Sequence, residues 1–487
     1  MTLSPAEQAL VAAVPTGLFI NGAWCEASDG ARVPVEDPST GLAFASVADA
    51  TVTDGGDALA AASAAQASWA ATAPRERGEL LLAAYELLTE RAEDFATLMT
   101  LEMGKPLAEA RGEVAYGAEF FRWFSEEAVR ISGRWMTAPN GATRLLTMKK
   151  PVGPTLMVTP WNFPLAMGTR KIGPAIAAGC TMVVKPATQT PLSMLALAAL
   201  LDEVGLPAGV LNVITTTRTA AVMEPLIRDP RARKLTFTGS TPVGRTLVEQ
   251  SATQLLRVSM ELGGNAPFIV FDDADLDAAV DGAMLAKMRN MGEACTAANR
   301  FLVQSGVADE FATRLTARME QLSIGRGTEA GVDVGPLIDA PAQAKVEELV
   351  DDAVLRGARV ACGGKPVGET GHFYAPTVLT DVPADARLLR EEIFGPVAAI
   401  ATFDTEDEAI SRANDTEYGL AAYVFSRDLS RVLRLAEQLE VGMVGVNQGI
   451  VSNPAAPFGG MKASGFGREG GLEGIEEYLE TTYVGIA

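Results

Sequence analysis

The stretch Lys234-Leu-Thr-Phe-Thr-Gly-Ser-Thr-Pro-Val-Gly244 shows the repeating unit of the fold most clearly. An apolar run of strand length ends in a Gly-Ser turn, and Pro242 suits the first turn of a following helix. Free N–H groups and the helix dipole at such a start favour a pyrophosphate. An ordinary capped turn explains the same residues equally well. The stretch therefore predicts a strand–turn–helix unit, with Gly239 and Ser240 as candidate phosphate contacts.

The same unit recurs from residue 155 to residue 261, where five predicted strands alternate with four predicted helices. This alternation indicates an α/β fold with a doubly wound parallel sheet that binds a dinucleotide at the carboxyl ends of its strands. The predicted strands are Thr155–Thr159, Thr181–Lys185, Val210–Ile214, Lys234–Thr238 and Arg257–Glu261, and the predicted helices are Leu165–Ala178, Pro191–Val204, Ala220–Arg228 and Val243–Gln254.

The flanking sequence predicts a second α/β domain and a small β element. Helical periodicity dominates residues 54–133, and a less regular α/β pattern follows residue 261. Asn140-Gly141 indicates a hairpin that could pair with the extended tail. We therefore expect a dinucleotide-binding domain (1–132 and 152–261), a catalytic domain (262–465) and an oligomerisation element (133–151 and 466–487).

Composition excludes several classes of function. The chain has 487 residues and a net charge of −21, which argues against binding nucleic acid or anionic membranes. Its four cysteines are widely spaced and His372 is the only histidine, so we expect no metal site and no disulfide framework. The N-terminus lacks the basic residues of a signal peptide, and no apolar run could span a membrane. A cytoplasmic protein is expected.

Four residues are candidates for chemistry, and each also has a plainer explanation. Cys295 lies among small residues and could be a nucleophile or an inert buried cysteine. Glu261 ends a predicted strand and could be a general base or a solvated strand end. Asn162, between two prolines, could donate to an oxyanion or form a turn. Lys185 ends another strand and could contact a ribose or phosphate, or only solvent.

Together these segments resemble the aldehyde dehydrogenase superfamily. Seven of its motifs occur here in its order, and they cover nearly the whole chain. They are Pro160-Trp-Asn-Phe-Pro164, Lys185-Pro186, Phe237-Thr-Gly-Ser240, Met260-Glu-Leu-Gly-Gly-Asn-Ala-Pro267, Gly292-Glu-Ala-Cys295, Glu391-Glu-Ile-Phe-Gly-Pro396 and Pro457-Phe-Gly-Gly460.

The resemblance implies that the protein oxidises an aldehyde through a covalent intermediate. Cys295 would attack the aldehyde carbon, and Asn162 and the Cys295 backbone N–H would hold the oxyanion. Hydride transfer would leave a thioester, which water activated by Glu261 would hydrolyse. Lys171 and Glu469 would relay protons. An aldehyde has no leaving group, so capture by sulfur prepares the departure of hydride.

The resemblance also implies a nicotinamide dinucleotide cofactor. NAD-preferring members usually carry a glutamate three residues after the motif lysine, and Thr188 stands there in this chain. We therefore expect NADP to be accepted and preferred, with NAD as the alternative. The residues implied for cofactor binding are Trp161, Lys185, Thr188, Gly239, Ser240, Leu262, Glu392 and Phe394.

Within the superfamily, finer signals resemble the succinate-semialdehyde dehydrogenases. Arg170, Arg289 and Ser452 match the residues that hold the distal carboxylate of the substrate in that group. Alternatively, the two arginines only pair with local acids. We therefore expect succinate semialdehyde to be the substrate, with glutarate semialdehyde or a broad range of aliphatic aldehydes as the alternative. A cysteine-dependent thioester hydrolase is a remote alternative, because that function gives the predicted cofactor-binding residues no role. We expect a homodimer or homotetramer.

Overall fold

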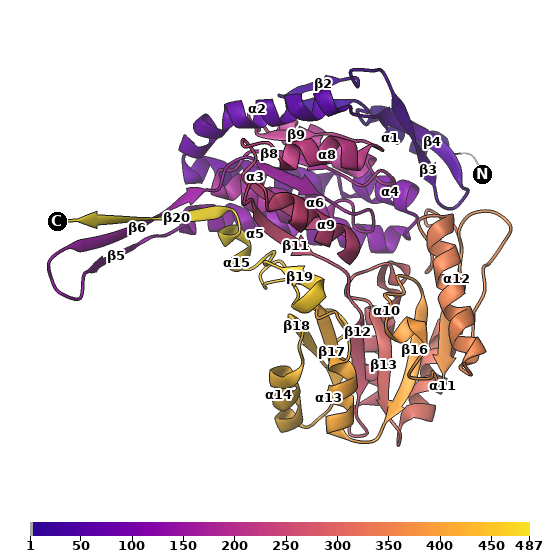
Figure 1. Cartoon of the computed structure of the whole chain (residues 1–487). Helices are drawn as coiled ribbons and strands as arrows, with labels where there is room; N and C mark the ends of the chain where they lie inside the picture. Colours follow the sequence, from indigo (N-terminus) through magenta and orange to yellow (C-terminus); the bar gives the residue numbers. More distant parts are fainter. Residues whose placement is uncertain (1–2) are drawn as a thin grey trace.

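The computed structural model describes residues 3–487 and consists of two α/β bodies and a projecting arm (Figure 1). The first body is built on an eight-stranded sheet and the second on a seven-stranded sheet. A separate three-stranded sheet forms the arm. These features confirm the predicted fold class. The three domain ranges predicted from the sequence remain a prediction.

The centre of the first sheet is parallel, in the order β11-β10-β7-β8-β9. The order reverses at β7, which has β10 on one side and β8 on the other, so the switch point of the sheet lies there. The strands and the helices between them agree with the predicted alternation. They are β7 (Thr155–Val158), α6 (Ala166–Ala178), β8 (Met182–Lys185), α7 (Leu192–Glu203), β9 (Leu211–Val213), α8 (Thr219–Ile227), β10 (Lys234–Thr238), α9 (Thr241–Ser251) and β11 (Arg257–Glu261).

Both edges of this sheet carry short antiparallel strands. β1 (Leu18–Ile20) pairs with β9 and with β2 (Ala23–Cys25). At the other edge β19 (Gly465–Phe466) pairs with β11, with Gly465 opposite Glu261. This pairing brings the C-terminal segment to the end of the strand that carries the predicted general base.

N-terminal helices cover the first sheet, and α5 packs along α6. Phe120, Phe121 and Phe124 of α5 are fully buried in the same apolar cluster as Ile172 of α6. The elements before the arm are α1 (Pro5–Ala13), β3 (Arg32–Asp37), β4 (Leu42–Ala48), α2 (Val52–Ala71), α3 (Pro74–Glu90), α4 (Ala92–Met103), α5 (Leu107–Glu127) and the 3-10 turn η1 (Ala128–Arg130).

The second body, drawn from rose through orange to yellow in Figure 1, has the strand order β14-β15-β16-β13-β12-β17-β18. All neighbouring pairs except β14–β15 are parallel. Its elements are β12 (Ala266–Val270), α10 (Leu276–Met288), η2 (Arg289–Gly292), β13 (Ala298–Gln304), α11 (Ala308–Glu320), α12 (Ala340–Leu355), β14 (Arg359–Cys362), β15 (Thr377–Thr380), η3 (Arg387–Leu389), β16 (Val397–Phe403), α13 (Glu406–Asn414), β17 (Ala421–Phe425), α14 (Leu429–Gln438), β18 (Met443–Val446) and η4 (Lys462–Ser464).

The arm consists of β5 (Arg134–Thr137), β6 (Arg144–Pro151) and β20 (Leu479–Ile486), with the short helix α15 (Glu473–Glu476) before β20. The tail strand β20 pairs with β6 along its whole length, as the sequence predicted. Figure 1 shows the hairpin and the C-terminus projecting together from the first body. Within residues 3–487, no helix combines the length and the apolarity that crossing a membrane requires.

Candidate active site

Cys295 lies on a strained loop that follows α10. Asn290, Met291 and Gly292 have consecutive positive φ values of 54°, 53° and 77°. Left-handed backbone is costly for methionine and persists only where the surroundings enforce it. A Cβ on Gly292 would lie 2.2 Å from the Gly395 carbonyl oxygen, so only glycine fits there. The loop is therefore held in one shape by its neighbours.

Asn162 lies after β7, and two buried side chains fix its backbone. Its carbonyl oxygen accepts hydrogen bonds from Lys105 Nζ at 2.7 Å and from Asn290 Nδ2 at 3.0 Å. Its own Nδ2 donates to the Glu293 carbonyl oxygen at 2.9 Å. The second amide hydrogen of Asn162 is thus free for a ligand, as is the Cys295 N–H, which has no acceptor within residues 3–487. Asn162 and Cys295 line one cavity of about 260 Å³, where the two N–H groups can stabilise an oxyanion.

The surroundings of Cys295 keep its thiol protonated. Burial raises the pKa of this thiol to about 12, although the nearby Arg170 opposes the shift. A nucleophile must be a thiolate, so attack requires a base that removes the proton.

Glu261 ends β11 and lines the same cavity as Cys295. Both of its carboxylate oxygens are buried, and neither accepts a hydrogen bond from the described residues. Burial and the charge of Glu469 raise the pKa of Glu261 well above its usual value. A carboxylate with a raised pKa binds protons more strongly near neutral pH, which suits a general base.

Glu469 has the opposite environment. It is ion-paired with Lys171 and, at 2.5 Å, with Arg170 of α6. Burial alone would raise the pKa of Glu469, but these two cations outweigh it and lower the pKa to about 2. Lys171 also donates to Thr236 Oγ1 at 2.9 Å. The two carboxylates, Glu261 and Glu469, therefore differ strongly in their affinity for protons.

A groove of about 610 Å³ runs along the carboxyl ends of β7, β8 and β10. Lys185, Thr188, Gly239 and Ser240 line it, together with Trp161. The start of α9 has no side-chain cap, which leaves its first N–H groups available for an anion. Burial lowers the pKa of Lys185 to about 8. The groove therefore offers amides and a lysine to a phosphate or ribose.

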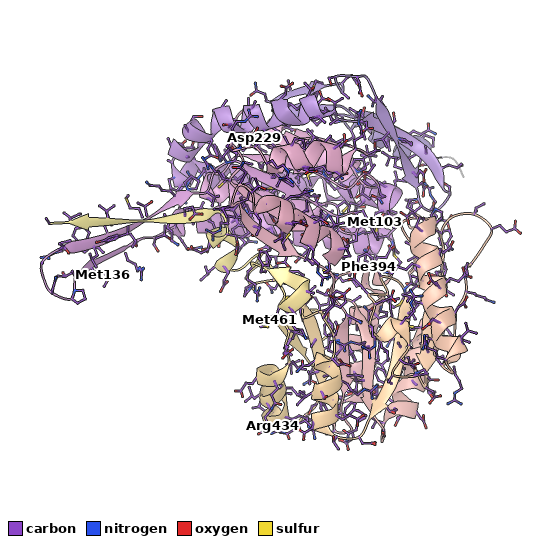
Figure 2. The ribbon with its side chains drawn as sticks, in the orientation of Figure 1. Met103, Met136, Asp229, Phe394, Arg434 and Met461 are labelled. Carbon is purple, nitrogen blue, oxygen red and sulfur yellow. The ribbon has the colours of Figure 1, made fainter. Side chains whose placement is uncertain are left out.

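A second set of residues connects this groove with Cys295. Trp161 and Phe394 pack edge to face with ring centroids 5.3 Å apart, and Leu262 lines the same cavity. Figure 2 shows Phe394 where the two bodies face each other. Burial raises the pKa of Glu392 to about 7, and its Oε1 accepts from Gly264 N at 3.0 Å. All eight predicted cofactor residues therefore line this groove or the cavity that holds Cys295.

Arg289 and Ser452 line a further cavity of about 800 Å³. The Arg289 guanidinium lies 4.9 Å from the centre of the Phe163 ring and 5.7 Å from that of Tyr116. It has no ion pair and donates no side-chain hydrogen bond within the described part of the chain. Arg170, by contrast, is fully buried, paired with Glu469 and stacked 4.0 Å over the Phe458 ring.

The sequence matches the Aldehyde dehydrogenase family over residues 24–484. The chain belongs to this family. A succinate-semialdehyde dehydrogenase of Paenarthrobacter nicotinovorans is 62% identical over 444 residues, which are 91% of this chain and 99% of the relative. A glutarate-semialdehyde dehydrogenase of Pseudomonas aeruginosa is 52% identical, covering 96% of both chains. The crystal structure of an E. coli NADP dependent enzyme superposes with a TM-score of 0.96 at 52% identity, covering 97% of this chain and 98% of that one.

Three buried or cavity-lining residues of this aldehyde dehydrogenase were not found from its sequence. Lys345 of α12 lines the cavity of Cys295 and Glu392. Lys105 and Glu113 form a fully buried ion pair of 2.5 Å, and Glu113 also accepts from the first N–H groups of α6. Lys105 and Glu113 reach the active site through Asn162, Leu165 and Ala166, which are more than fifty residues away in sequence, so no local signal could have found this role. No cluster of three metal-ligating side chains occurs within residues 3–487.

Proposed function

We propose that this aldehyde dehydrogenase oxidises a short aldehyde with a distal carboxylate, succinate semialdehyde to succinate, with NADP or NAD. The observation that carries the substrate class is Arg289. A cation without an acidic partner, flanked by Phe163 and Tyr116, lines a cavity next to the loop of Cys295. A guanidinium there can bind a carboxylate bidentately, and Ser452 can donate a further hydrogen bond.

In the first stage of the proposed reaction, the thiol proton passes to Glu261 and Cys295 sulfur bonds to the aldehyde carbon. The carbonyl oxygen becomes an oxyanion, which accepts from Asn162 Nδ2 and the Cys295 N–H. Preorganised donors of this kind stabilise the transition state without reorganising. The positive charge of Arg170 beside the sulfur also favours its anionic form.

In the second stage the carbon–oxygen double bond reforms as the hydride leaves, giving a thioester on Cys295. When bound, the nicotinamide ring accepts that hydride. Glu261 first passes the thiol proton to the buried network of Lys171 and Glu469. It then takes a proton from water as the water oxygen attacks the thioester carbon, and the carbon–sulfur bond breaks to release the Cys295 thiolate. We assign Lys171 and Glu469 to carrying the proton away, because their ion pair adjoins Glu261 in a buried network. The products are the carboxylate, the reduced cofactor and protons.

The groove supports a nicotinamide dinucleotide, and we propose that NADP is preferred. Uncapped amides at the start of α9 suit a pyrophosphate, and Glu392 suits ribose hydroxyls. Thr188 donates its hydroxyl to the Thr216 carbonyl oxygen at 3.1 Å, so it presents no negative charge beside Lys185. The structurally similar E. coli protein is itself described as NADP dependent.

Glutarate semialdehyde is the second candidate, since a relative 52% identical is named for that substrate. One additional methylene group changes binding in an apolar pocket only modestly. Broad-range oxidation of uncharged aldehydes is a weaker candidate, because it leaves the free cation at Arg289 without a role. The remote alternative, a thioester hydrolase without redox chemistry, gives the dinucleotide groove no role.

The experiment that tests the proposal follows the absorbance of reduced nicotinamide with purified enzyme. Succinate semialdehyde, glutarate semialdehyde and butanal are each supplied with NADP or NAD. We expect the highest kcat/KM with succinate semialdehyde and NADP. Absence of reduction with every aldehyde would refute the proposed function, and equal kcat/KM for butanal would refute the carboxylate specificity.

Replacing Arg289 with methionine is expected to lower kcat/KM for succinate semialdehyde about 10- to 100-fold, because hydrogen bonds to a charged group typically contribute that much to binding. The value for butanal should change little. Arg318 is a matched control, because it lines the same cavity but pairs with Asp281 at 2.5 Å. Arg318→Met should leave both values near wild type. Equal losses for charged and uncharged aldehydes in Arg289→Met would contradict the role assigned to Arg289.

Replacing Thr188 with glutamate should raise KM for NADP at least about tenfold, because a carboxylate would face the 2′-phosphate. KM for NAD should stay the same or fall. Thr188→Gln has nearly the same size without the charge and should have the smaller effect on NADP. If both variants raised KM for NADP equally, lost space and not charge would explain the change.

We also propose that the protein forms a homodimer or homotetramer in the cytoplasm. The arm exposes Trp135, Met136, Tyr483 and Ile486, and Figure 2 shows Met136 on the arm away from both large sheets. Exposed apolar groups grouped on one element favour a protein interface. The four cysteines are all free thiols, which is the usual state in a reducing compartment.

A further inference from the structure

Lys287, near the end of α10, is a fully buried lysine without a carboxylate partner. Its Nζ donates to Asn299 Oδ1 at 2.9 Å and to the Gly395 carbonyl oxygen at 3.1 Å. Both acceptors are neutral, and Lys287 forms no ion pair within residues 3–487. None of the reaction steps described above uses it.

A buried ammonium without a counter-ion is unfavourable unless the structure compensates for it. Burial lowers the pKa of Lys287 to about 7, and the attraction of Glu392 only partly offsets that effect. A methionine or leucine would fill the same space without this cost. What distinguishes the lysine from such an apolar side chain is the pair of hydrogen bonds that it donates.

These hydrogen bonds tie the Gly395 carbonyl oxygen to α10 and β13, the two elements that flank the Cys295 loop. Gly395 belongs to the loop Glu391–Pro396, here called the cofactor loop, which carries Glu392 and Phe394. Its carbonyl oxygen also lies against Gly292 of the loop that carries Cys295. Phe394 has a φ of 56°, so the cofactor loop is strained just before the carbonyl that Lys287 holds.

We propose that Lys287 is a positioning residue that fixes the cofactor loop against the Cys295 loop. With the Gly395 carbonyl held, Glu392 and Phe394 are kept in place for the ribose and nicotinamide of the cofactor. Lys287 thereby sets the affinity for the cofactor without touching it. This inference rests on the proposed dinucleotide cofactor. It adds Lys287, which lies outside the family motifs found in the sequence.

The test compares cofactor affinity with a reaction that uses Cys295 but no cofactor. Lys287→Met keeps the length and apolar stem of the side chain and removes its donors. We expect the Kd of NADP, measured by quenching of tryptophan fluorescence, to rise about tenfold or more, as loss of a charged hydrogen bond implies. Hydrolysis of p-nitrophenyl acetate by Cys295 should stay near the wild-type rate in Lys287→Met. Lys287→Gln keeps an N–H donor and should therefore show a smaller rise in the Kd of NADP.

Phe311→Leu serves as the stability control. Phe311 of α11 is fully buried in the apolar core against the seven-stranded sheet, and it lies outside both loops. It should destabilise the second body while leaving the Kd of NADP unchanged. The inference is overturned if Lys287→Met binds NADP like wild type, or if ester hydrolysis falls in parallel with binding. If Lys287→Met does not fold, an unchanged Kd in Lys287→Gln together with unchanged Kd in Asn299→Leu overturns it.

The same experiment separates this inference from the proposed function. If wild-type enzyme neither binds NADP or NAD nor reduces them, the proposed function fails first. If wild-type enzyme binds and reduces the cofactor and the Lys287 variants do so equally well, only the role of Lys287 fails.

Discussion

Replacing Cys295 with alanine is expected to lower kcat for aldehyde oxidation by at least ~10⁴-fold, the scale seen when a covalent nucleophile is removed. Without the sulfur no covalent adduct forms, and hydride has no tetrahedral carbon to leave. Because Cys295 lines the cavity and does not hold the groove at β8 and β10 together, the Kd of NADP should change little. Reduced nicotinamide and tryptophan fluorescence measure the two effects separately.

Cys180 provides the matched control for that substitution. It is fully buried, its thiol donates to the Tyr478 carbonyl oxygen at 3.3 Å, and burial raises its pKa to about 11. Cys180→Ala removes a buried thiol that lies outside both cavities, so kcat should stay near wild type. Substantial aldehyde oxidation by the Cys295→Ala enzyme would mean that this thiol is not the nucleophile.

Replacing Glu261 with glutamine is expected to lower the steady-state kcat about 10²- to 10⁴-fold, the usual contribution of a general base. The amide cannot take a proton from water, so the thioester should accumulate. Because the pKa of the Cys295 thiol is about 12, only a small fraction is thiolate at pH 9, but irreversible hydride transfer and stalled hydrolysis draw the enzyme towards the thioester. Incubation at pH 9 should therefore show a slow burst of reduced nicotinamide close to one equivalent per active site, followed by still slower turnover.

Glu102 is a suitable control for the change at Glu261. It is also fully buried with a pKa raised to about 7 by burial, but it accepts from the first N–H groups of α7 and lines neither cavity. Glu102→Gln is expected to lower the free energy of unfolding, whereas its kcat should remain close to wild type. A Glu261→Gln enzyme without a burst and with normal thiol alkylation would contradict the role of Glu261 in hydrolysis.

The parallel centre of the first sheet could be predicted because each strand and helix is long enough to show its own periodicity. The ends of Lys234–Thr238 and Arg257–Glu261 were predicted to the residue. The edge strand β19 was not, since it has only two residues. A strand that short has no readable alternation, and its pairing with β11 is decided by contacts distant in sequence.

The prediction of the family is confirmed. Most candidate site residues could be predicted because they belong to short sequence motifs that are recognisable from neighbouring residues alone. What the sequence could not provide is the pairing of charges. Arg170 and Arg289 were expected to act alike, yet Arg170 is buried against Glu469 while Arg289 has no acidic partner. Ion pairing across 299 residues depends on the pairing of β19 with β11. Sequence patterns do not reveal such long-range contacts.

The intact mass of the Glu261→Gln enzyme, after mixing with succinate semialdehyde and NADP, shows directly whether oxidation passes through a thioester. We expect a covalent succinyl group, and peptide mapping should place it on Cys295. The adduct should require the oxidised cofactor and should be absent from Cys295→Ala. Formation of reduced nicotinamide without any acyl adduct, or an adduct on another residue, would contradict oxidation through a Cys295 thioester.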